Sequence, residues 1–215
     1  MLPTHALAGM ALALPVAYVS PEFAVVALGA GLLGGIFPDI DMYTGHRKLL
    51  HYPVYYTALA VPAVLIAGLA PSAGTVFGAV FLVGAAVHSR TDVLGGGLEL
   101  RPWEASSDRA VYDHYRGRWI PPRRRIRYDG SPGDLLLSYT LAVPLLVTLE
   151  GLFYWAVVAT LAVASVYTAV RRVLPTLAVT VLELVGPWLP DSVLSSLPPR
   201  YRETHRPPSA PDPSD

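Results

Sequence analysis

The sequence predicts an all-α membrane protein, a polytopic transmembrane helical bundle of about six spans, and three observations support this prediction. Of its 215 residues, 53% are hydrophobic and only 15% are charged, whereas an average soluble domain carries about 25% charged residues. Continuous apolar runs recur along most of the chain. Five or six such runs leave too little polar surface to coat a soluble globule. We therefore favour membrane helices over the alternative, a soluble bundle of buried apolar helices.

The apolar segments can be followed along the chain. The first four are residues 6–19, 23–37, 54–70 and 75–87. Residues 135–170 are apolar except at Glu150 and Gly151. A single helix of that length would span about 54 Å, against a hydrocarbon core of about 30 Å, so we expect two helices that turn at this point. Residues 174–189 contain Glu183 and two prolines, and form either a seventh span or an interfacial helix.

These segments divide the chain into four parts. We expect residues 1–97 to form a four-helix membrane core, and residues 98–134 to form a cytoplasmic loop rich in arginine and aromatic residues. Residues 135–197 then supply two further membrane helices plus the interfacial or seventh helix. Residues 198–215 are polar and rich in proline, which predicts a disordered tail.

The cations predict an orientation. Arg47 and Lys48 lie between the second and third segments, eight arginines lie in residues 99–134, and Arg171 and Arg172 end the sixth segment. The turns at residues 20–22 and 71–74 carry no cation. If each segment crosses once, all the cations lie on one side, which the positive-inside rule assigns to the cytoplasm. We expect a multi-pass protein of the cell (inner, cytoplasmic) membrane, with its amino terminus on the cytoplasmic side.

Composition also excludes several classes of function. The chain has no cysteine, which excludes a disulfide framework, a thiol nucleophile and a cysteine-ligated metal. The net charge is zero, so no global basic field points to nucleic acid, and no nucleic-acid partner is expected. The aromatic residues and arginines of residues 98–134 are typical of the lipid headgroup layer. We expect membrane lipids as partners, with this segment acting as a lid, a lipid-binding surface or an ordinary cytoplasmic loop.

Histidines and aspartates lie near the ends of four separate segments, and the predicted topology brings all of them to one membrane face. They are His5, Asp39, Asp41, His46, His51, His88 and Asp92. His88 and Asp92 are four residues apart, so both project from one helix face. An ionised aspartate at membrane depth costs roughly 2.5–3.5 kcal/mol, and the aspartates therefore need a partner. Arginine or lysine is one option, but a divalent cation would also use the neutral histidines.

The choice of metal follows from the donor types. Mixed histidine and carboxylate sets suit Zn²⁺, Mn²⁺ or Fe²⁺, and we expect one or two divalent ions, with zinc or manganese favoured. The predicted metal ligands are His5, Asp39, His51, His88 and Asp92. More ordinary interpretations exist for each residue alone: a helix cap for His5, turn chemistry for Asp39, and a salt bridge between Asp39 and Arg47.

The same residues form a set that resembles a known family. They are Thr4-His5 with Gly9, the stretch Gly34-Gly35-x-x-Pro38-Asp39-Ile40-Asp41, His46-Arg47 with His51, and His88-x-x-x-Asp92 followed by Gly95-Gly96-Gly97. Over about residues 1–105 the chain resembles the YdjM-like family of membrane-bound metal-dependent hydrolases, of the LexA-binding, inner-membrane-associated type, and it looks like an archaeal member. It departs from the family pattern beside His51, where Leu50 and Tyr52 stand in place of the family's threonine and serine.

The leading hypothesis is a membrane-embedded metal-dependent hydrolase that cleaves a phosphoester or lipid-like substrate with metal-activated water. In this interpretation Asp39, His51, His88 and Asp92 bind the metal. The predicted catalytic residues are Asp41, as a further ligand or general base, and His46 or Arg47, facing the developing oxyanion. A non-catalytic membrane scaffold clamped by metal is the alternative. A metal-ion transporter is disfavoured because the middles of the spans are almost wholly apolar.

Overall fold

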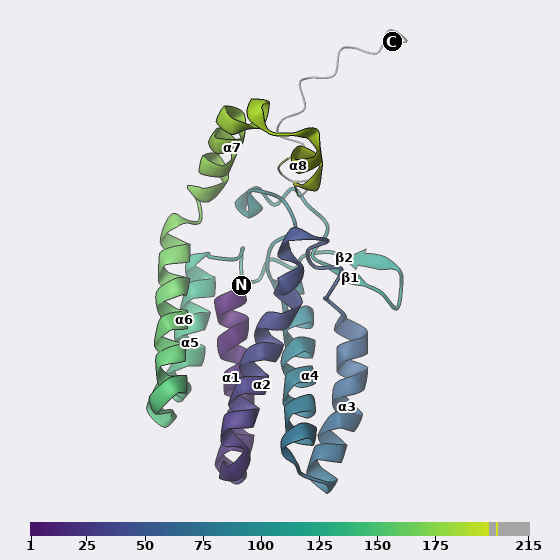
Figure 1. Cartoon of the computed structure of the whole chain (residues 1–215), viewed down its shortest axis with the longest axis vertical. Helices are drawn as coiled ribbons and strands as arrows, with labels where there is room; N and C mark the ends of the chain where they lie inside the picture. The colour runs from purple at the N-terminus through teal and green to yellow at the C-terminus, as the bar shows by residue number, and fades with distance from the viewer. Residues whose placement is uncertain (198–200, 202–215) are drawn as a thin grey trace.

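The structure, a computed structural model, describes residues 1–197 and residue 201, and the rest of the predicted disordered tail lies outside the described residues. The chain is mostly helical (Figure 1). Its helices are α1 (Leu2–Val19), α2 (Ala24–Ile36), α3 (Pro53–Leu69), α4 (Ala73–Thr91), α5 (Pro132–Thr148), α6 (Gly151–Val170), α7 (Leu174–Val185) and α8 (Asp191–Ser196). A 3₁₀ segment, Phe37–Tyr43, continues α2. Because α5 ends before Glu150 and α6 begins after it, the long apolar stretch is two helices.

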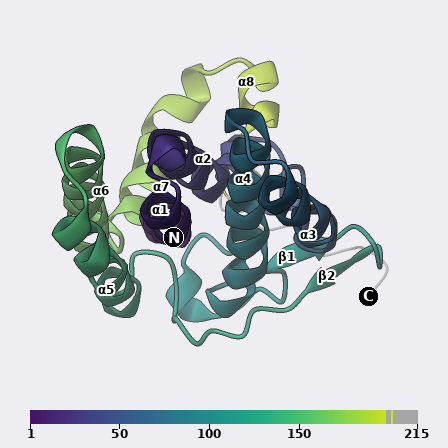
Figure 2. The same cartoon turned by 90° about the horizontal axis from the view of Figure 1, so that it is seen from below.

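The first four helices form the centre of the bundle. Helix α1 packs against α2, α2 packs against α4, and α4 packs against α3. The α5–α6 pair adds to the outer side of α1, and the view along the bundle shows the same order of neighbours (Figure 2). Two buried apolar clusters hold these contacts together, one around Leu7, Met10 and Leu145, and one around Leu28 and Val80.

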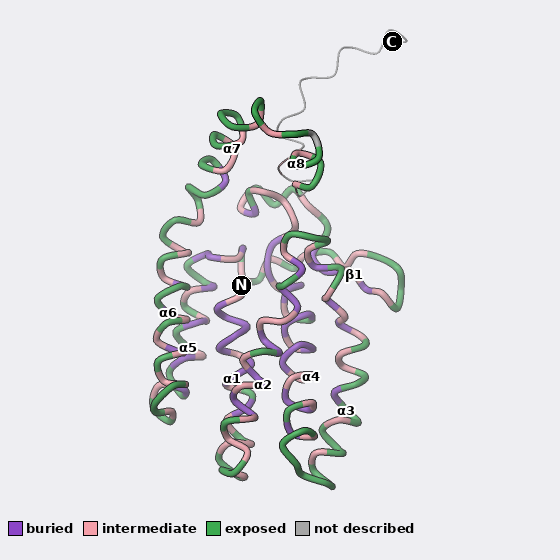
Figure 3. The backbone as a smooth tube through the Cα atoms, viewed as in Figure 1, coloured by how far each residue is buried: buried purple, intermediate pink, exposed green. Residues whose placement is uncertain are grey.

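Length and composition support a membrane protein. Four helical segments are long and apolar enough to cross a membrane, namely Leu2–Val19, Pro21–Tyr43, Ala73–Leu94 and Gly151–Val170. Three apolar helices are shorter, namely Pro53–Leu69, Pro132–Thr148 and Leu174–Trp188. The outward faces of these helices are exposed (Figure 3), and the exposed residues include many large hydrophobic ones. Such surfaces are unfavourable in water and suited to lipid. The prediction of helices long and apolar enough to cross a membrane is thus confirmed, whereas the total of six spans stays a prediction.

The structure differs from an all-α fold in one place. Strands β1 (Val111–Asp113) and β2 (Arg118–Ile120) form an antiparallel hairpin within the polar segment between α4 and α5. Val111 is fully buried beside Val93, at the end of α4, while its neighbour Tyr112 is only half-buried, so the strand alternates between two faces. The backbone N–H of Tyr112 donates to the carbonyl of Arg47 at 2.9 Å. The hairpin therefore fixes the segment to the loop that precedes α3.

Glycines bring α1 and α2 into backbone contact. A Cβ atom added at Gly9 would lie 2.0 Å from the carbonyl oxygen of Gly31, and one added at Gly31 would lie 2.2 Å from the carbonyl oxygen of Gly9. A Cβ atom at Gly35 would lie 2.2 Å from the carbonyl oxygen of His5. No larger residue fits at these crossings without moving a helix. The close approach sets the distance between the start of α1 and the end of α2.

This packing makes a prediction. Replacing Gly31 with alanine forces α1 and α2 apart, and we expect a loss of about 1–3 kcal/mol in stability, the usual cost of overpacking. Gly29 lies on the same helix, and a Cβ atom added there would meet nothing within 4 Å. Its replacement by alanine is therefore expected to be neutral or slightly stabilising. Thermal unfolding in detergent micelles compares the two variants, and equal melting temperatures would contradict the packing described.

Candidate metal site

Four ligand-bearing residues meet at one end of the bundle. Asp39 lies in the 3₁₀ segment that follows α2, His51 lies just before α3 begins at Pro53, and His88 and Asp92 lie at the end of α4. All four are buried, and one ligand atom from each lies within 4.8 Å of the others. Three separate chain segments thus converge on one point. This buried cluster can hold a metal ion, and we call it the Asp/His cluster.

Local sequence explains how each segment reaches the Asp/His cluster. Pro38 occupies the first turn of the 3₁₀ segment, where its missing N–H is not needed, and the tighter turn directs Asp39 inward. The i, i+4 spacing places His88 and Asp92 on one face of α4, as the sequence predicts. Pro53 starts α3, and a proline disfavours helical backbone at the residue before it, Tyr52, so the helix begins after His51.

The facing atoms of the Asp/His cluster are close but not hydrogen-bonded. Nε2 of His51 lies 3.2 Å from Oδ2 of Asp92 and 3.7 Å from Oδ1 of Asp39. Nε2 of His88 lies 3.5 Å from Oδ1 of Asp39 and 3.7 Å from Oδ2 of Asp92. Both Nε2 atoms and Oδ2 of Asp92 are buried without a hydrogen-bond partner in the described part of the chain. Buried polar atoms are normally paired, and one cation between them would satisfy all three.

The outer nitrogens of both histidines are held by acceptors. Nδ1 of His88 lies 2.6 Å from the carbonyl oxygen of Gly35. A carbonyl oxygen only accepts, so Nδ1 of His88 must carry the proton. Nδ1 of His51 lies 3.0 Å from Oδ2 of Asp41, and an ionised carboxylate likewise requires a donor. With Nδ1 protonated, each Nε2 presents its lone pair to the centre, which is the arrangement found around metal-binding histidines.

Asp41 lies behind His51 and outside the four-residue cluster. Oδ2 of Asp41 also accepts from the backbone N–H of Leu50 at 3.0 Å, and Oδ1 accepts from the backbone N–H of Arg47 at 3.2 Å. Oδ1 lies 3.2 Å from Nδ1 of His46. Both carboxylate oxygens are thus used to fold the loop before α3. Asp41 thus holds the ring of His51 from behind, and its predicted role as a further ligand or general base stays a prediction.

The remaining predicted residues surround the Asp/His cluster. His5, a predicted ligand, lies next to it, with Nε2 3.1 Å from Oγ1 of Thr91 and 3.7 Å from Oδ1 of Asp92. Its ring packs against that of His88 with centroids 4.0 Å apart. Nε of Arg47 lies 3.3 Å from Oδ2 of Asp92, and Nη1 of Arg47 donates to the carbonyl of Gly96 at 2.7 Å. Arg47 therefore supplies a fixed positive charge beside the cluster.

Electrostatics differ for the two loop histidines. Burial acts to lower the pKa of His51, but the hydrogen bond to Asp41 and the nearby Asp92 carboxylate outweigh it and raise that pKa above its ordinary value. A raised pKa favours the protonated imidazole. Metal binding would displace the proton on Nε2 of His51, since only a neutral imidazole binds metal. Burial lowers the pKa of His46 below its ordinary value despite the hydrogen bond to Asp41.

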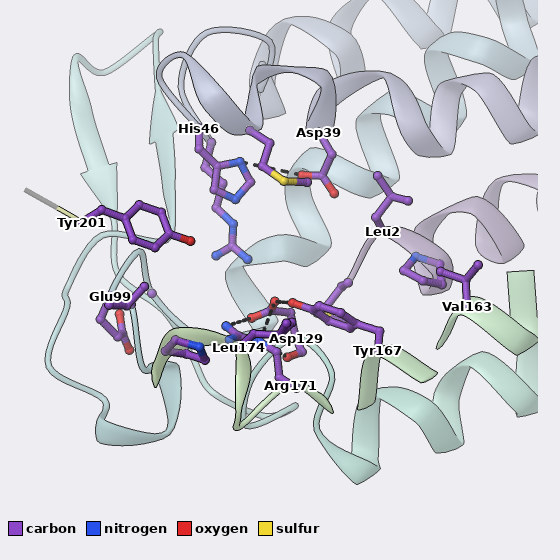
Figure 4. Close-up of a pocket in the computed structure, with 17 residues that line it drawn as sticks. Leu2, Asp39, His46, Glu99, Asp129, Val163, Tyr167, Arg171, Leu174 and Tyr201 are labelled. Carbon is purple, nitrogen blue, oxygen red and sulfur yellow. Dashed lines mark hydrogen bonds and ion pairs between the residues drawn. The ribbon is translucent and has the colours of Figure 1, made fainter. Parts of the chain in front are cut away.

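A cavity borders Asp39, one of the four members of the Asp/His cluster. Its volume is about 360 Å³, and Asp39, His46 and Arg47 form one wall. Tyr167 and Arg171, from the end of α6, face them across the cavity (Figure 4). Asp39 thus belongs both to the Asp/His cluster and to the cavity wall. No signal in the sequence indicates that α6 contributes to this site, because the contact depends on the long-range packing of α6 beside α1.

Comparison of the chain with family models, with curated proteins and with solved structures finds no match. The assignment of the site therefore depends on its own geometry.

Asp41 offers a test that spares the ligands themselves. Replacing Asp41 with asparagine keeps its shape but removes the charged acceptor for His51, and such changes typically cost about 10–100-fold in metal affinity. Asp113 is also a buried aspartate, but it lies in the hairpin and accepts from Tyr115 and Arg116, so D113N is the matched control. Competition with a chromophoric chelator measures zinc and manganese affinity. Wild-type affinity in a folded D41N variant would overturn the role given to Asp41.

Proposed function

We propose that the protein is a membrane-embedded metal-dependent hydrolase that cleaves a phosphoester in a lipid-like substrate. One observation carries the proposal. Three buried atoms that face one another lack hydrogen-bond partners in the described part of the chain, and Asp39, the remaining member of the Asp/His cluster, lines a cavity. A metal with only structural duties needs no such cavity at its edge, whereas a catalytic metal must be reached by substrate and water.

The donor set suits one divalent ion, and zinc or manganese fits it best. Two imidazoles and two carboxylates are ligands that both metals accept. The four ligand atoms lie within 4.8 Å of one another, a spread that one ion can bridge. When bound, the ion supplies Lewis-acid polarisation of the scissile group and lowers the pKa of water to near 7.

Residues of the chain would carry out the other steps. Arg47, held by Asp92 and the carbonyl of Gly96, would bind the phosphoryl oxygens and stabilise their charge. His46 donates from Nδ1 to Asp41, which leaves Nε2 to accept a proton from the attacking water. The water oxygen bonds to phosphorus as the bond from phosphorus to the alcohol oxygen breaks. The proton taken up by His46 then passes to that alcohol oxygen.

The distribution of cations over the fold supports a cytoplasmic site. The loop with Arg47, the segment 98–134 and the α6–α7 junction lie at the end of the bundle that carries the Asp/His cluster (Figure 1). The turns without cations, α1–α2 and α3–α4, lie at the other end. We place the site on the cytoplasmic side of the cell membrane by the positive-inside rule, in a multi-pass protein of about six spans. The resemblance of residues 1–105 to the inner-membrane-associated YdjM-like hydrolases also supports a location in the cell membrane.

A metal-clamped scaffold is the second candidate, and a specific observation favours it. The four buried ligands tie together α4, the end of α2 and the start of α3, which a structural metal would also do. Transport has less support. Among the described residues, the buried polar side chains of α1, α2 and α4 are confined to the end with the Asp/His cluster. No polar path through the bundle is therefore visible in this part of the chain.

Hydrolysis itself is the test. Purified protein with manganese or zinc should cleave bis(4-nitrophenyl) phosphate, and chelation should abolish the activity. H88A and D92A should each lose at least about 100-fold in kcat/KM, because each removes a ligand of the activating ion. S89A is the matched control, since Ser89 is buried next to His88 on α4 and its hydroxyl makes no hydrogen bond in the described residues.

Two results would contradict the proposed function. Activity that survives complete removal of metal would show that hydrolysis does not use the Asp/His cluster. A metal-loaded protein that cleaves no phosphoester, soluble or lipid-like, would favour the scaffold.

A further inference from the structure

The cavity beside Asp39 has one apolar wall. This wall comes from the start of α1, from α6 and from the start of α7. Its members are Leu2, Val163, Leu174 and Pro175. Leu2 and Val163 belong to helices long enough to cross a membrane. We call this space the apolar cavity, and its volume of about 360 Å³ lies within the range of about 300–1,000 Å³ that is usual for small-molecule sites.

A second, larger cavity adjoins it on the polar side. Its volume is about 930 Å³, and Lys48, Arg101 and Arg109 are among its lining residues, together with serines of the segment 98–134. We call this space the polar cavity. Four residues line both spaces, and these are Met42, His46, Glu99 and Leu100. The two cavities therefore meet at His46, next to the Asp/His cluster.

The far side of the apolar cavity is closed by a fixed contact. The hydroxyl of Tyr167 donates to Oδ2 of Asp129, and Arg171 donates from Nη2 to Oδ1 of Asp129 at 3.3 Å. These bonds join the segment 98–134 to the end of α6. Arg171 is thus paired with Asp129. Arg47 lies with Asp39 on the opposite wall, where it is held by Asp92 and the carbonyl of Gly96.

The apolar cavity is bordered by the outer face of α6. Val163 lines this cavity, yet 57% of its surface is exposed. An apolar side chain that is both a cavity wall and a lipid-facing residue indicates lateral access from the bilayer. Apolar groups would enter from this side, and polar groups would lie in the polar cavity. The polar cavity is lined by three cations, Lys48, Arg101 and Arg109, and by three acids, Glu99, Glu104 and Asp108, which suits a polar head group. Arg47, beside Asp39, is the cation that fits a phosphate between the two cavities.

We propose that the site binds an amphiphilic phosphoester, with its alkyl or acyl chain in the apolar cavity, its phosphate at Asp39 and Arg47, and its polar head group in the polar cavity. This inference deepens the proposed function and depends on it for the reaction. It identifies the substrate class as a membrane amphiphile that carries a phosphoester and a single alkyl or acyl chain. The metal site would then lie beside the phosphoester bond of the substrate, where the two cavities meet.

The experiment uses two exposed valines of α6. Val163 lines the apolar cavity and Val166 does not, although their exposed fractions, 57% and 64%, are similar. V163W fills the cavity, and V166W adds the same ring to the lipid-facing surface. Dodecyl phosphate and inorganic phosphate are the two probes, titrated calorimetrically into metal-loaded protein at one fixed concentration of dodecyl maltoside micelles.

We expect V163W to weaken the binding of dodecyl phosphate at least tenfold, with no change in the binding of inorganic phosphate or in metal content. V166W should bind both probes as wild type does. Equal binding of dodecyl phosphate by the two variants would overturn the proposal. So would equal weakening of both probes in V163W, which would mean that the tryptophan disturbs the phosphate position and not a chain-binding space.

Hydrolysis of two 4-nitrophenyl phosphodiesters, one with a dodecyl and one with a methyl group, separates this inference from the proposed function. If wild type cleaves the dodecyl ester faster than the methyl ester, and V163W but not V166W removes this difference, the result supports both the chain-binding cavity and the hydrolase. Cleavage of both esters at one rate, unaffected by V163W, would leave the hydrolase standing and contradict the chain-binding cavity. The expected dodecyl phosphate binding without any hydrolysis would support the cavity and contradict the hydrolase.

Discussion

Two buried carboxylates, those of Asp39 and Asp92, face the Nε2 atoms of His51 and His88. The rest of the structure depends on how the negative charge of these carboxylates is neutralised. Nδ1 of His51 donates to Asp41, and Nδ1 of His88 donates to the carbonyl of Gly35. Arg47 offsets only part of the negative charge. Buried charge without a partner is costly, so the cluster demands a further cation. A divalent metal meets that demand with the ligands already in place.

The surrounding fold holds this arrangement rigid. Glycine contacts between α1 and α2 leave no room for adjustment, and Gly35 has a double function because its position permits the crossing and its carbonyl orients His88. Asp41 organises the loop that carries His51. The hairpin is tied to that same loop through Arg47. The second half of the chain completes the site, since α6 and α7 provide the apolar wall opposite the ligands.

Local sequence patterns predicted part of the fold and of the candidate site, whereas the remaining features depend on long-range packing. Runs of apolar residues predicted the membrane-length helices, and the spacing of His88 and Asp92 predicted their shared face, because both depend on one helix at a time. The inner group of four was among the five ligands expected. The place of Asp41 behind His51 could not be predicted, since it depends on how the loop between them folds back. The hairpin escaped notice because its strands are only three residues each.

The most direct test of the account is the melting temperature with and without chelator, for wild type, D92A and S89A. A metal that binds only the folded state stabilises it by about 2.7 kcal/mol at one hundred times its Kd. For a chain of this size that corresponds to a fall of about 5–10 °C on chelation, which we predict for wild type and S89A. D92A lacks a ligand and should shift little. Equal shifts in wild type and D92A, or no shift in wild type protein first loaded with zinc or manganese, would contradict the claim that the Asp/His cluster is a metal site.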